Sequence, residues 1–145
     1  APTASKAAGL YMICTISKHI AERAGFADAM MLDWQGRIAE ATGANVFFVR
    51  DGVIHTPPID SILDGLTRRT VISLAKARGI EVIVRDIYPE ELSTFSECWL
   101  TGSAAEVTPV SQIGEYSFTP GEISRTMMED YTALVHRKIA MPVAA

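Results

Sequence analysis

The chain has 145 residues, of which 48% are hydrophobic and 21% charged, and its formal net charge is −4. These proportions are typical of one folded domain with a buried core and exclude a disordered chain. The acidic balance and the lack of a basic run argue against a nucleic-acid partner, and no stretch approaches the roughly 18 consecutive apolar residues of a membrane span.

The cysteines and histidines point to no metal site and no disulfide. Cys14 and Cys98 lie far apart in apolar settings, so we expect two buried free thiols in a reducing, cytoplasmic environment. The three histidines, His19, His55 and His136, are scattered and have no cysteine at metal-ligand spacing.

The first half of the chain predicts one helix followed by two hairpins. Apolar residues recur every three or four positions from Lys6 to Ala24, which indicates an amphipathic helix that ends at Gly25. The hairpin strands are then expected at 30–32 and 37–40, and at 45–50 and 53–56. The second hairpin turns at Asp51-Gly52, a strong local signal.

The second half alternates helices and strands. Pro57-Pro58 begins a loop that runs to Asp64. Helices are expected at 67–78, 89–92 and 120–138, and strands at 80–87, 98–101 and 107–113. The pattern predicts a single mixed α/β domain over residues 1–145, with an antiparallel-rich sheet surrounded by helices.

Two joints between these elements carry residues suited to binding. Glu40 ends a strand and is followed by the small residues of "ATGAN", so it could meet a cationic ring nitrogen; the plainer interpretation is a bulged turn with a solvated carboxylate. Gly65, Leu66 and Thr67 open a helix, whose free N–H groups bind anions. The alternative there is an ordinary helix start capped by Asp64 or Thr67.

A third joint and one lysine complete the set. "TGSAAEVTPV" follows a strand, and Thr101 and Ser103 add hydroxyl groups to a corner that could hold a phosphate or a carboxylate. The alternative is a β-bulge or a tight bend. Lys6 lies between small residues, with Tyr11 five positions later, although most lysines are solvated surface charges.

These parts match the needs of one cofactor. Pyridoxal phosphate requires a lysine for its aldehyde, an acid for its pyridine nitrogen, a donor for its phenolic oxygen and an anion site for its phosphate. The chain offers Lys6, Glu40 and Tyr11 for the first three, and the joints at 65–67 and 101–104 for the phosphate.

The segments "SKAAGLYM", "EATGANVFFVRDG", "TPPIDSILDGLTRRTVISLAKARGIEV" and "TGSAAEVTPV" resemble branched-chain amino-acid aminotransferases, which are fold type IV, or class IV, pyridoxal-phosphate enzymes. The resemblance extends from about Lys6 to Lys138, with the motifs in the family's order. It implies the family's C-terminal domain, an antiparallel-rich pseudo-barrel with surrounding helices.

The resemblance also implies a role for each matched residue. Lys6 matches the Schiff-base lysine that moves the α-proton, Tyr11 the tyrosine at the phenolic oxygen, and Glu40 the partner of the pyridine nitrogen. Gly43 would let the chain pass close to the ring, and Asn45 would tie the loop together. The remaining matches are Gly65, Leu66, Thr67 and Ser103 around the phosphate, and Ser103 and Ala104 at the substrate carboxylate.

Several expectations follow from that resemblance. The reaction would be the transfer of an amino group from leucine, isoleucine or valine to 2-oxoglutarate, in a homodimer or larger assembly. Family members have a smaller N-terminal domain before the lysine segment, so we expect this chain to be the larger domain alone and to be inactive by itself. The alternatives are a D-amino-acid transaminase, an aminodeoxychorismate lyase-like enzyme, or a noncatalytic truncated domain.

Overall fold

The computed structural model describes residues 5–142 and has three α-helices and two 3-10 helices among them. The helices are α1 (Met12–Arg23), α2 (Leu66–Ala77) and α3 (Glu122–Val135), and the 3-10 helices are η1 (Ala8–Tyr11) and η2 (Pro89–Thr94). None of the helices in this part of the chain is long and apolar enough to cross a membrane.

The main sheet has five strands in the order β5-β4-β3-β6-β7. These strands are β3 (Asn45–Arg50), β4 (Val53–Thr56), β5 (Val82–Val84), β6 (Glu97–Gly102) and β7 (Glu106–Pro109). Only the β4–β5 pair is parallel, and the other neighbours run antiparallel. The expected mixed α/β fold with an antiparallel-rich sheet is therefore confirmed.

Two small two-stranded sheets flank the main one. They are formed by β1 (Met30–Leu32) with β2 (Ile38–Ala41), and by β8 (Gln112–Ile113) with β9 (Tyr116–Ser117). The short β8–β9 hairpin was not predicted, because the sequence pattern suggested one strand over 107–113. The chain instead bends after Pro109, where Val110 N–H still bonds to Cys98 in β6.

Strand β3 is buried on both faces, which explains its continuous apolar run. Alternate side chains point to opposite faces of a strand. Phe47 and Val49 accordingly belong to a core shared with α2 and α3, while Val46 and Phe48 belong to a second core beneath η2 and β8–β9. Phe47 also stacks on Trp99 of β6, with ring centroids 5.5 Å apart.

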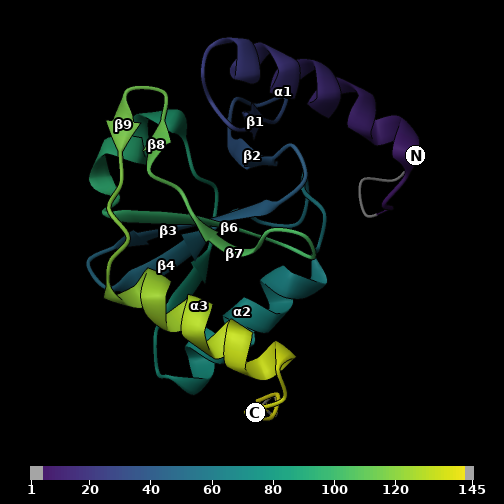
Figure 1. Ribbon diagram of the computed structural model, residues 1–145. Coiled ribbons are helices and arrows are strands. Elements are labelled where there is room, and N and C mark those ends of the chain that lie inside the picture. Colours follow the sequence, from purple (N-terminus) through teal and green to yellow (C-terminus); the bar gives the residue numbers. More distant parts are fainter. Residues whose placement is uncertain (1–4, 143–145) are drawn as a thin grey trace.

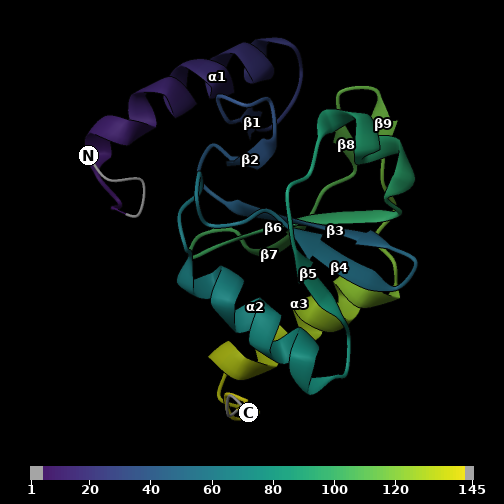
Figure 2. The same ribbon diagram turned by 180° about the vertical axis from the view of Figure 1, so that it is seen from behind.

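The layers follow from these two cores. Helices α2 and α3 lie side by side against one face of the main sheet (Figures 1 and 2). Helix α1 lies beyond the small β1–β2 sheet, away from α2 and α3 (Figure 1). The sheet thus has one face covered by helices and the other by η2 and the β8–β9 hairpin.

The turn between β3 and β4 forms as the sequence predicted. Asp51 and Gly52 both have positive φ, 52° and 77°, and Arg50 pairs with Val53. A two-residue turn with positive φ at both central positions matches the right-handed twist of the strands it joins. The Asp-Gly pair therefore fixes the register of the hairpin.

The expectation for the first helix needed adjustment. The helix expected over Lys6–Ala24 begins as a 3-10 turn at Ala8 and becomes an α-helix only at Met12. Its apolar residues Met12, Ile13, Ile16 and Ile20 are all more than half exposed to solvent. The amphipathic pattern is real, but no described residue covers its apolar face.

The strand expected over Ile80–Ile87 is shorter than predicted, because only Val82–Val84 pairs with β4. Beyond it, Arg85 and Asp86 are engaged in side-chain interactions, and the carbonyl of Ile87 accepts a hydrogen bond from Ile38 N–H at 2.7 Å. The segment after β5 therefore leaves the main sheet and joins β2.

Candidate functional site

A cavity of about 270 Å³ lies where β2 ends, β3 begins, β6 ends and α2 starts. Asn45 and Thr101 face one another in the β3–β6 pair at its floor. The residues that line the cavity are Lys6, Tyr11, Glu40, Gly43, Ala44, Asn45, Leu63, Asp64, Gly65, Leu66, Thr67, Thr101, Gly102 and Ser103. Chain segments that are distant in sequence thus meet at one hollow.

The structure brings the residues proposed for the cofactor together around this cavity. Lys6, Tyr11, Glu40, Gly43, Gly65, Leu66, Thr67 and Ser103 are all among its lining residues. Ala104, proposed for the substrate carboxylate, follows Ser103 in the turn after β6 but is not one of the lining residues. An amine, a phenol, a carboxylate and several hydroxyl groups therefore share one hollow.

Glu40 is one of the two carboxylates that line the cavity, and it is held on two sides. Its Oε2 accepts a hydrogen bond from Asn45 Nδ2 at 2.7 Å, and its Oε1 accepts one from Leu63 N–H at 3.3 Å. Burial raises the pKa of Glu40, although these hydrogen bonds and the charge of Arg68 oppose the rise. The interpretation of Glu40 as a freely solvated turn residue is wrong.

Asn45 ties the loop before α2 to Glu40, the role that the resemblance implied for it. Its Nδ2 donates to Glu40 and also to the carbonyl of Leu63 at 2.8 Å. Leu63 therefore uses both backbone groups, one for Glu40 and one for Asn45. Sequence reasoning missed Leu63, because its polar contribution is entirely main-chain and leaves no signal in the residue type.

The start of α2 faces the cavity without a side-chain cap. Gly65 is the N-cap residue, and no side chain of the described residues caps the first turn. The alternative of a helix start capped by Asp64 or Thr67 does not form, since Asp64 pairs with Arg69 at 2.5 Å and with Arg68 at 3.6 Å. The N–H groups of the first turn and the positive end of the helix dipole are thus open to an anion.

Gly65 has a packing reason to be glycine. A Cβ atom built at this position would lie under 3.0 Å from Asn45 Oδ1, closer than real atoms approach. Its φ of −65° and ψ of 139° suit any residue, so the contact and not the backbone requires glycine. The helix start can therefore approach Asn45, and through it Glu40, only without a side chain at 65.

Lys6 and Tyr11 reach the cavity from the N-terminal segment. Lys6 precedes η1 and is exposed, whereas Tyr11 ends η1 and is partly buried. Burial raises the pKa of Tyr11, and the negative charge of Glu40 raises it further. Tyr11 therefore keeps its phenolic proton near neutral pH and can act as a hydrogen-bond donor.

The third joint, 101–110, forms a tight turn between β6 and β7. Ser103 follows the end of β6, and Glu106 begins β7 with a φ of 51°. Gly102 lies close to the β2–β3 corner, where an added Cβ would sit 3.4 Å from the Gly43 carbonyl oxygen. The tight bend foreseen as an alternative is present, and it also places Thr101, Gly102 and Ser103 at the cavity.

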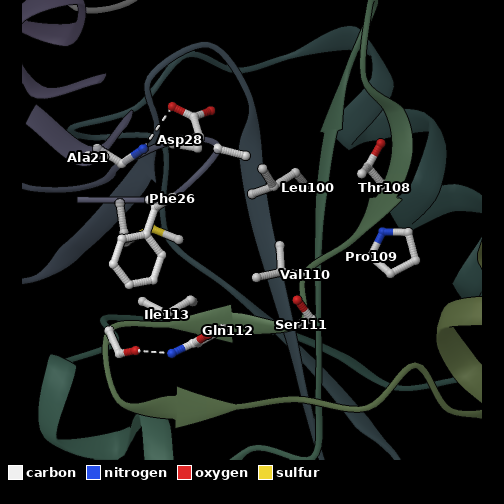
Figure 3. Close-up of a pocket in the computed structure, with 16 residues that line it drawn as sticks. Ala21, Phe26, Asp28, Leu100, Thr108, Pro109, Val110, Ser111, Gln112 and Ile113 are labelled. Atoms are coloured by element: carbon white, nitrogen blue, oxygen red, sulfur yellow. Dashed lines mark hydrogen bonds between the residues drawn. The ribbon is translucent and has the colours of Figure 1, made fainter. Parts of the chain in front are cut away.

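A larger cavity of about 560 Å³ lies elsewhere, between the end of α1 and the β7–β8 segment. Phe26, Val110 and Ile113 surround it, and among the described residues that line it only Asp28 is ionisable (Figure 3). Asp28 is already bonded to Ala29 N–H at 2.8 Å and to the Thr42 hydroxyl. Its size exceeds that of the Lys6–Glu40 cavity, but it lacks a comparable set of reactive groups.

The fold and the clustering of Lys6, Glu40 and the open start of α2 agree with a known family. The family model for class IV amino-transferases matches residues 3–113, and the chain belongs to this family.

Individual relatives carry a more specific name. The branched-chain-amino-acid aminotransferase of Pseudomonas aeruginosa is 34% identical over 139 residues, which are 94% of this chain and 45% of the relative. The chain thus spans about half the length of the curated relatives that it matches.

Solved structures give the same result. The branched-chain aminotransferase of Thermoproteus uzoniensis with norvaline has a TM-score of 0.91 at 38% identity, and the match covers 94% of this chain and 46% of that structure. The branched-chain amino acid aminotransferase of Thermobaculum terrenum in its PLP form has a TM-score of 0.92 at 34% identity. The match covers 96% of this chain and 47% of that structure.

Proposed function

We propose that this chain is the cofactor-binding domain of a pyridoxal-phosphate aminotransferase that moves the amino group of leucine, isoleucine or valine to 2-oxoglutarate. The observation that carries the proposal is that Lys6 and Glu40 line one cavity although they are far apart in the sequence. Family membership and the names of the relatives support the reaction class.

The residues at the cavity fit the proposed cofactor. A phosphate needs several donors and a positive potential, and the uncapped start of α2 offers both at Leu66 and Thr67. Gly65 has no side chain that would cover the backbone N–H groups at that point, and Ser103 adds a hydroxyl group from another segment that lines the cavity. Pyridoxal phosphate, when bound, supplies an electron sink for the carbanion formed at the substrate's α-carbon.

Each of the other groups has a distinct task in the proposal. Lys6 would hold the cofactor through its amine and would carry the α-proton. Glu40 would hold a proton at the ring nitrogen, and such a cationic partner would favour the ionised form of this partly buried carboxylate. Tyr11 would donate to the phenolic oxygen, and Gly43 would leave room for the ring. Ser103 and Ala104 offer N–H groups to the substrate carboxylate.

Assembly and location complete the proposal. The apolar face of α1 supports a homodimer or larger assembly, because Met12 and Ile20 are 71% and 61% exposed. Cys14 and Cys98 are both free, which supports a cytoplasmic location. We also propose that a smaller domain of the same enzyme completes the substrate pocket.

Covalent labelling tests the cofactor site in the 145-residue chain. The protein is mixed with pyridoxal phosphate, reduced with borohydride and digested, and the modified lysine is found by mass spectrometry. We expect the label on Lys6, its loss in Lys6→Ala, and its retention in the control Lys18→Ala. A label that stays in Lys6→Ala would place the site elsewhere.

Turnover tests the reaction class in the complete reading frame that contains this chain. We expect leucine, isoleucine and valine to be used with 2-oxoglutarate, and D-alanine and aminodeoxychorismate to be poor substrates. Glu40→Gln should reduce turnover far more than cofactor affinity, because the ring nitrogen loses its ionised partner. Preferred use of D-alanine or aminodeoxychorismate would reassign the enzyme within the fold.

A further inference from the structure

Arg37 lies outside the cavity and is bound to three carboxylates from three segments of the chain. Its Nε donates to Asp33 Oδ2 at 2.6 Å, and its two terminal nitrogens donate to Asp86 Oδ1 at 2.9 Å and to Asp60 Oδ2 at 3.1 Å. The side chain of Arg37 is only 11% exposed. A planar guanidinium with several fixed donors is suited to such a junction.

One of these three segments is the loop 57–65, which forms a wall of the cavity. Leu63, Asp64 and Gly65 of this loop line the cavity, and Leu63 holds Glu40 and Asn45 through its backbone. Arg37 forms its ion pair with this loop at Asp60, three residues before Leu63. The contact thus lies on the outer side of the same short segment that fixes the Glu40 carboxylate.

The ends of the loop are secured independently. Arg68 donates to the carbonyl of Pro57 at 2.9 Å and pairs with Asp64 at 3.6 Å. The middle of the loop between these anchors contains Asp60, Ile62 and Leu63. Leu63 is held by its backbone bonds to Glu40 and Asn45, and the packing of the buried Ile62 side chain and the Arg37–Asp60 pair hold the residues before it.

We infer that Arg37 is a positioning residue of the proposed cofactor site: through Asp60 it holds loop 57–65 so that Leu63 keeps the Glu40 carboxylate in place. The importance of that placement for a cofactor rests on the proposed function. The mechanical part, the dependence of the Leu63–Glu40 hydrogen bond on Asp60, does not rest on it.

The third carboxylate provides a matched control. Asp86 pairs with the same guanidinium, and its side chain is 47% exposed, against 55% for Asp60. It belongs to the segment after β5, which is bonded to β2 through Ile87 and does not line the cavity. Removing Asp86 therefore takes one ion pair from Arg37, as removing Asp60 does, but it leaves the contact between Arg37 and loop 57–65 intact.

The test compares Asp60→Ala with Asp86→Ala in the 145-residue chain. Amide hydrogen exchange at Leu63 reports local opening of the loop. We expect Asp60→Ala to speed this exchange about three- to tenfold, the range for a partly exposed, charge-assisted hydrogen bond, and Asp86→Ala to leave it within about twofold. The thermal midpoints of the two variants should fall by similar amounts.

A titration with pyridoxal phosphate, followed by absorbance, gives the second measurement. We expect Asp60→Ala to weaken binding about three- to tenfold and Asp86→Ala to leave it unchanged. Equal Leu63 exchange in the two variants, whether fast or slow, would overturn the positioning role. Faster exchange in Asp60→Ala alone, together with no binding by any variant or by the parent, would support the loop contact and refute the proposed function.

Discussion

Asn45 and Glu40 form a short polar contact in the site, with Asn45 Nδ2 donating to Glu40 Oε2 at 2.7 Å. The same nitrogen donates to Leu63, whose N–H returns to the other oxygen of Glu40. Both oxygens of this partly buried carboxylate are thus satisfied by groups that cannot rotate freely. The orientation of Glu40 is consequently set before any ligand is bound.

Asn45→Asp should be strongly destabilising, because it replaces the shared donor with a second carboxylate beside Glu40. The lost hydrogen bonds alone should lower the free energy of unfolding by about 1–3 kcal/mol, and the buried like charge should add to this. Urea unfolding at about pH 7 measures the loss. At about pH 4 the loss should shrink, since protonation of one carboxyl restores a donor.

Asn45→Ala is the control for that pH dependence. It removes the same hydrogen bonds but adds no charge, so its cost should change much less between the two pH values. Equal behaviour of the two variants would show that a carboxylate introduced at position 45 does not repel Glu40, and the contact would then be weaker than its geometry indicates.

Gly65→Ala should disturb the site from the opposite side. The added Cβ would come closer than 3.0 Å to Asn45 Oδ1, so Asn45 must move or the start of α2 must shift. Overpacking of this kind costs about 1–3 kcal/mol, measured by urea unfolding. In an Asn45→Ala background the collision is gone, and the same substitution should cost clearly less. Additive costs in this double-mutant cycle would contradict the close approach.

Much of this arrangement could be predicted from the sequence where the signal is local. The Asp51-Gly52 turn set the register of one hairpin. The small residues around Gly43, Gly65 and Gly102 marked the three joints that the structure brings to one cavity. In each case a few neighbouring residues already limit the conformations that the backbone can adopt.

Other features depend on contacts that no local pattern encodes. Arg37 meets Asp60 and Asp86, which lie 23 and 49 residues away, and nothing in the sequence pairs them. The cap by Asp64, considered as an alternative at the start of α2, does not form because Asp64 pairs with Arg69 instead. Strand β5 likewise ends early because the carbonyl of Ile87 accepts a hydrogen bond from Ile38 in β2, which is a tertiary contact.

Gly121→Ala should destabilise the last helix without affecting cofactor binding. Glu97 of β6 accepts hydrogen bonds from the backbone N–H and the hydroxyl group of Ser124, in the first turn of α3. A Cβ at 121 would lie under 3.0 Å from Glu97 Oε1 and push this carboxylate out of place. We expect a loss of about 1–3 kcal/mol in the free energy of unfolding.

Gly9→Ala is the matched control for that experiment, since a Cβ at 9 meets no atom of the described residues within 4 Å. It should leave the unfolding midpoint nearly unchanged. If Gly121→Ala is as mild as Gly9→Ala, the Glu97–Ser124 contact does not constrain the approach of α3 to the sheet.

His55 makes the stability of the chain sensitive to acid. It is buried, and its Nδ1 accepts a hydrogen bond from Arg85 Nε at 3.1 Å, so the ring must be neutral. Burial lowers the pKa of His55, and the positive charges of Arg85 and Arg50 lower it further, against the weaker opposing effect of Glu91 and Glu81. At mildly acidic pH, His55 therefore binds a proton more readily in the unfolded chain than in the folded chain.

The sign of the effect follows from that difference. Below the unfolded pKa of about 6.5 the unfolded state binds more protons, so the stability that neutral His55 supports above this value is lost as the pH falls. We expect urea unfolding to show a steeper loss of stability between about pH 7 and about pH 5 in the parent than in His55→Gln, which cannot titrate but retains an acceptor for Arg85. Parallel pH profiles for the two proteins would mean that His55 is protonated equally in both states, and the Arg85–His55 hydrogen bond could not then exist as the structure has it.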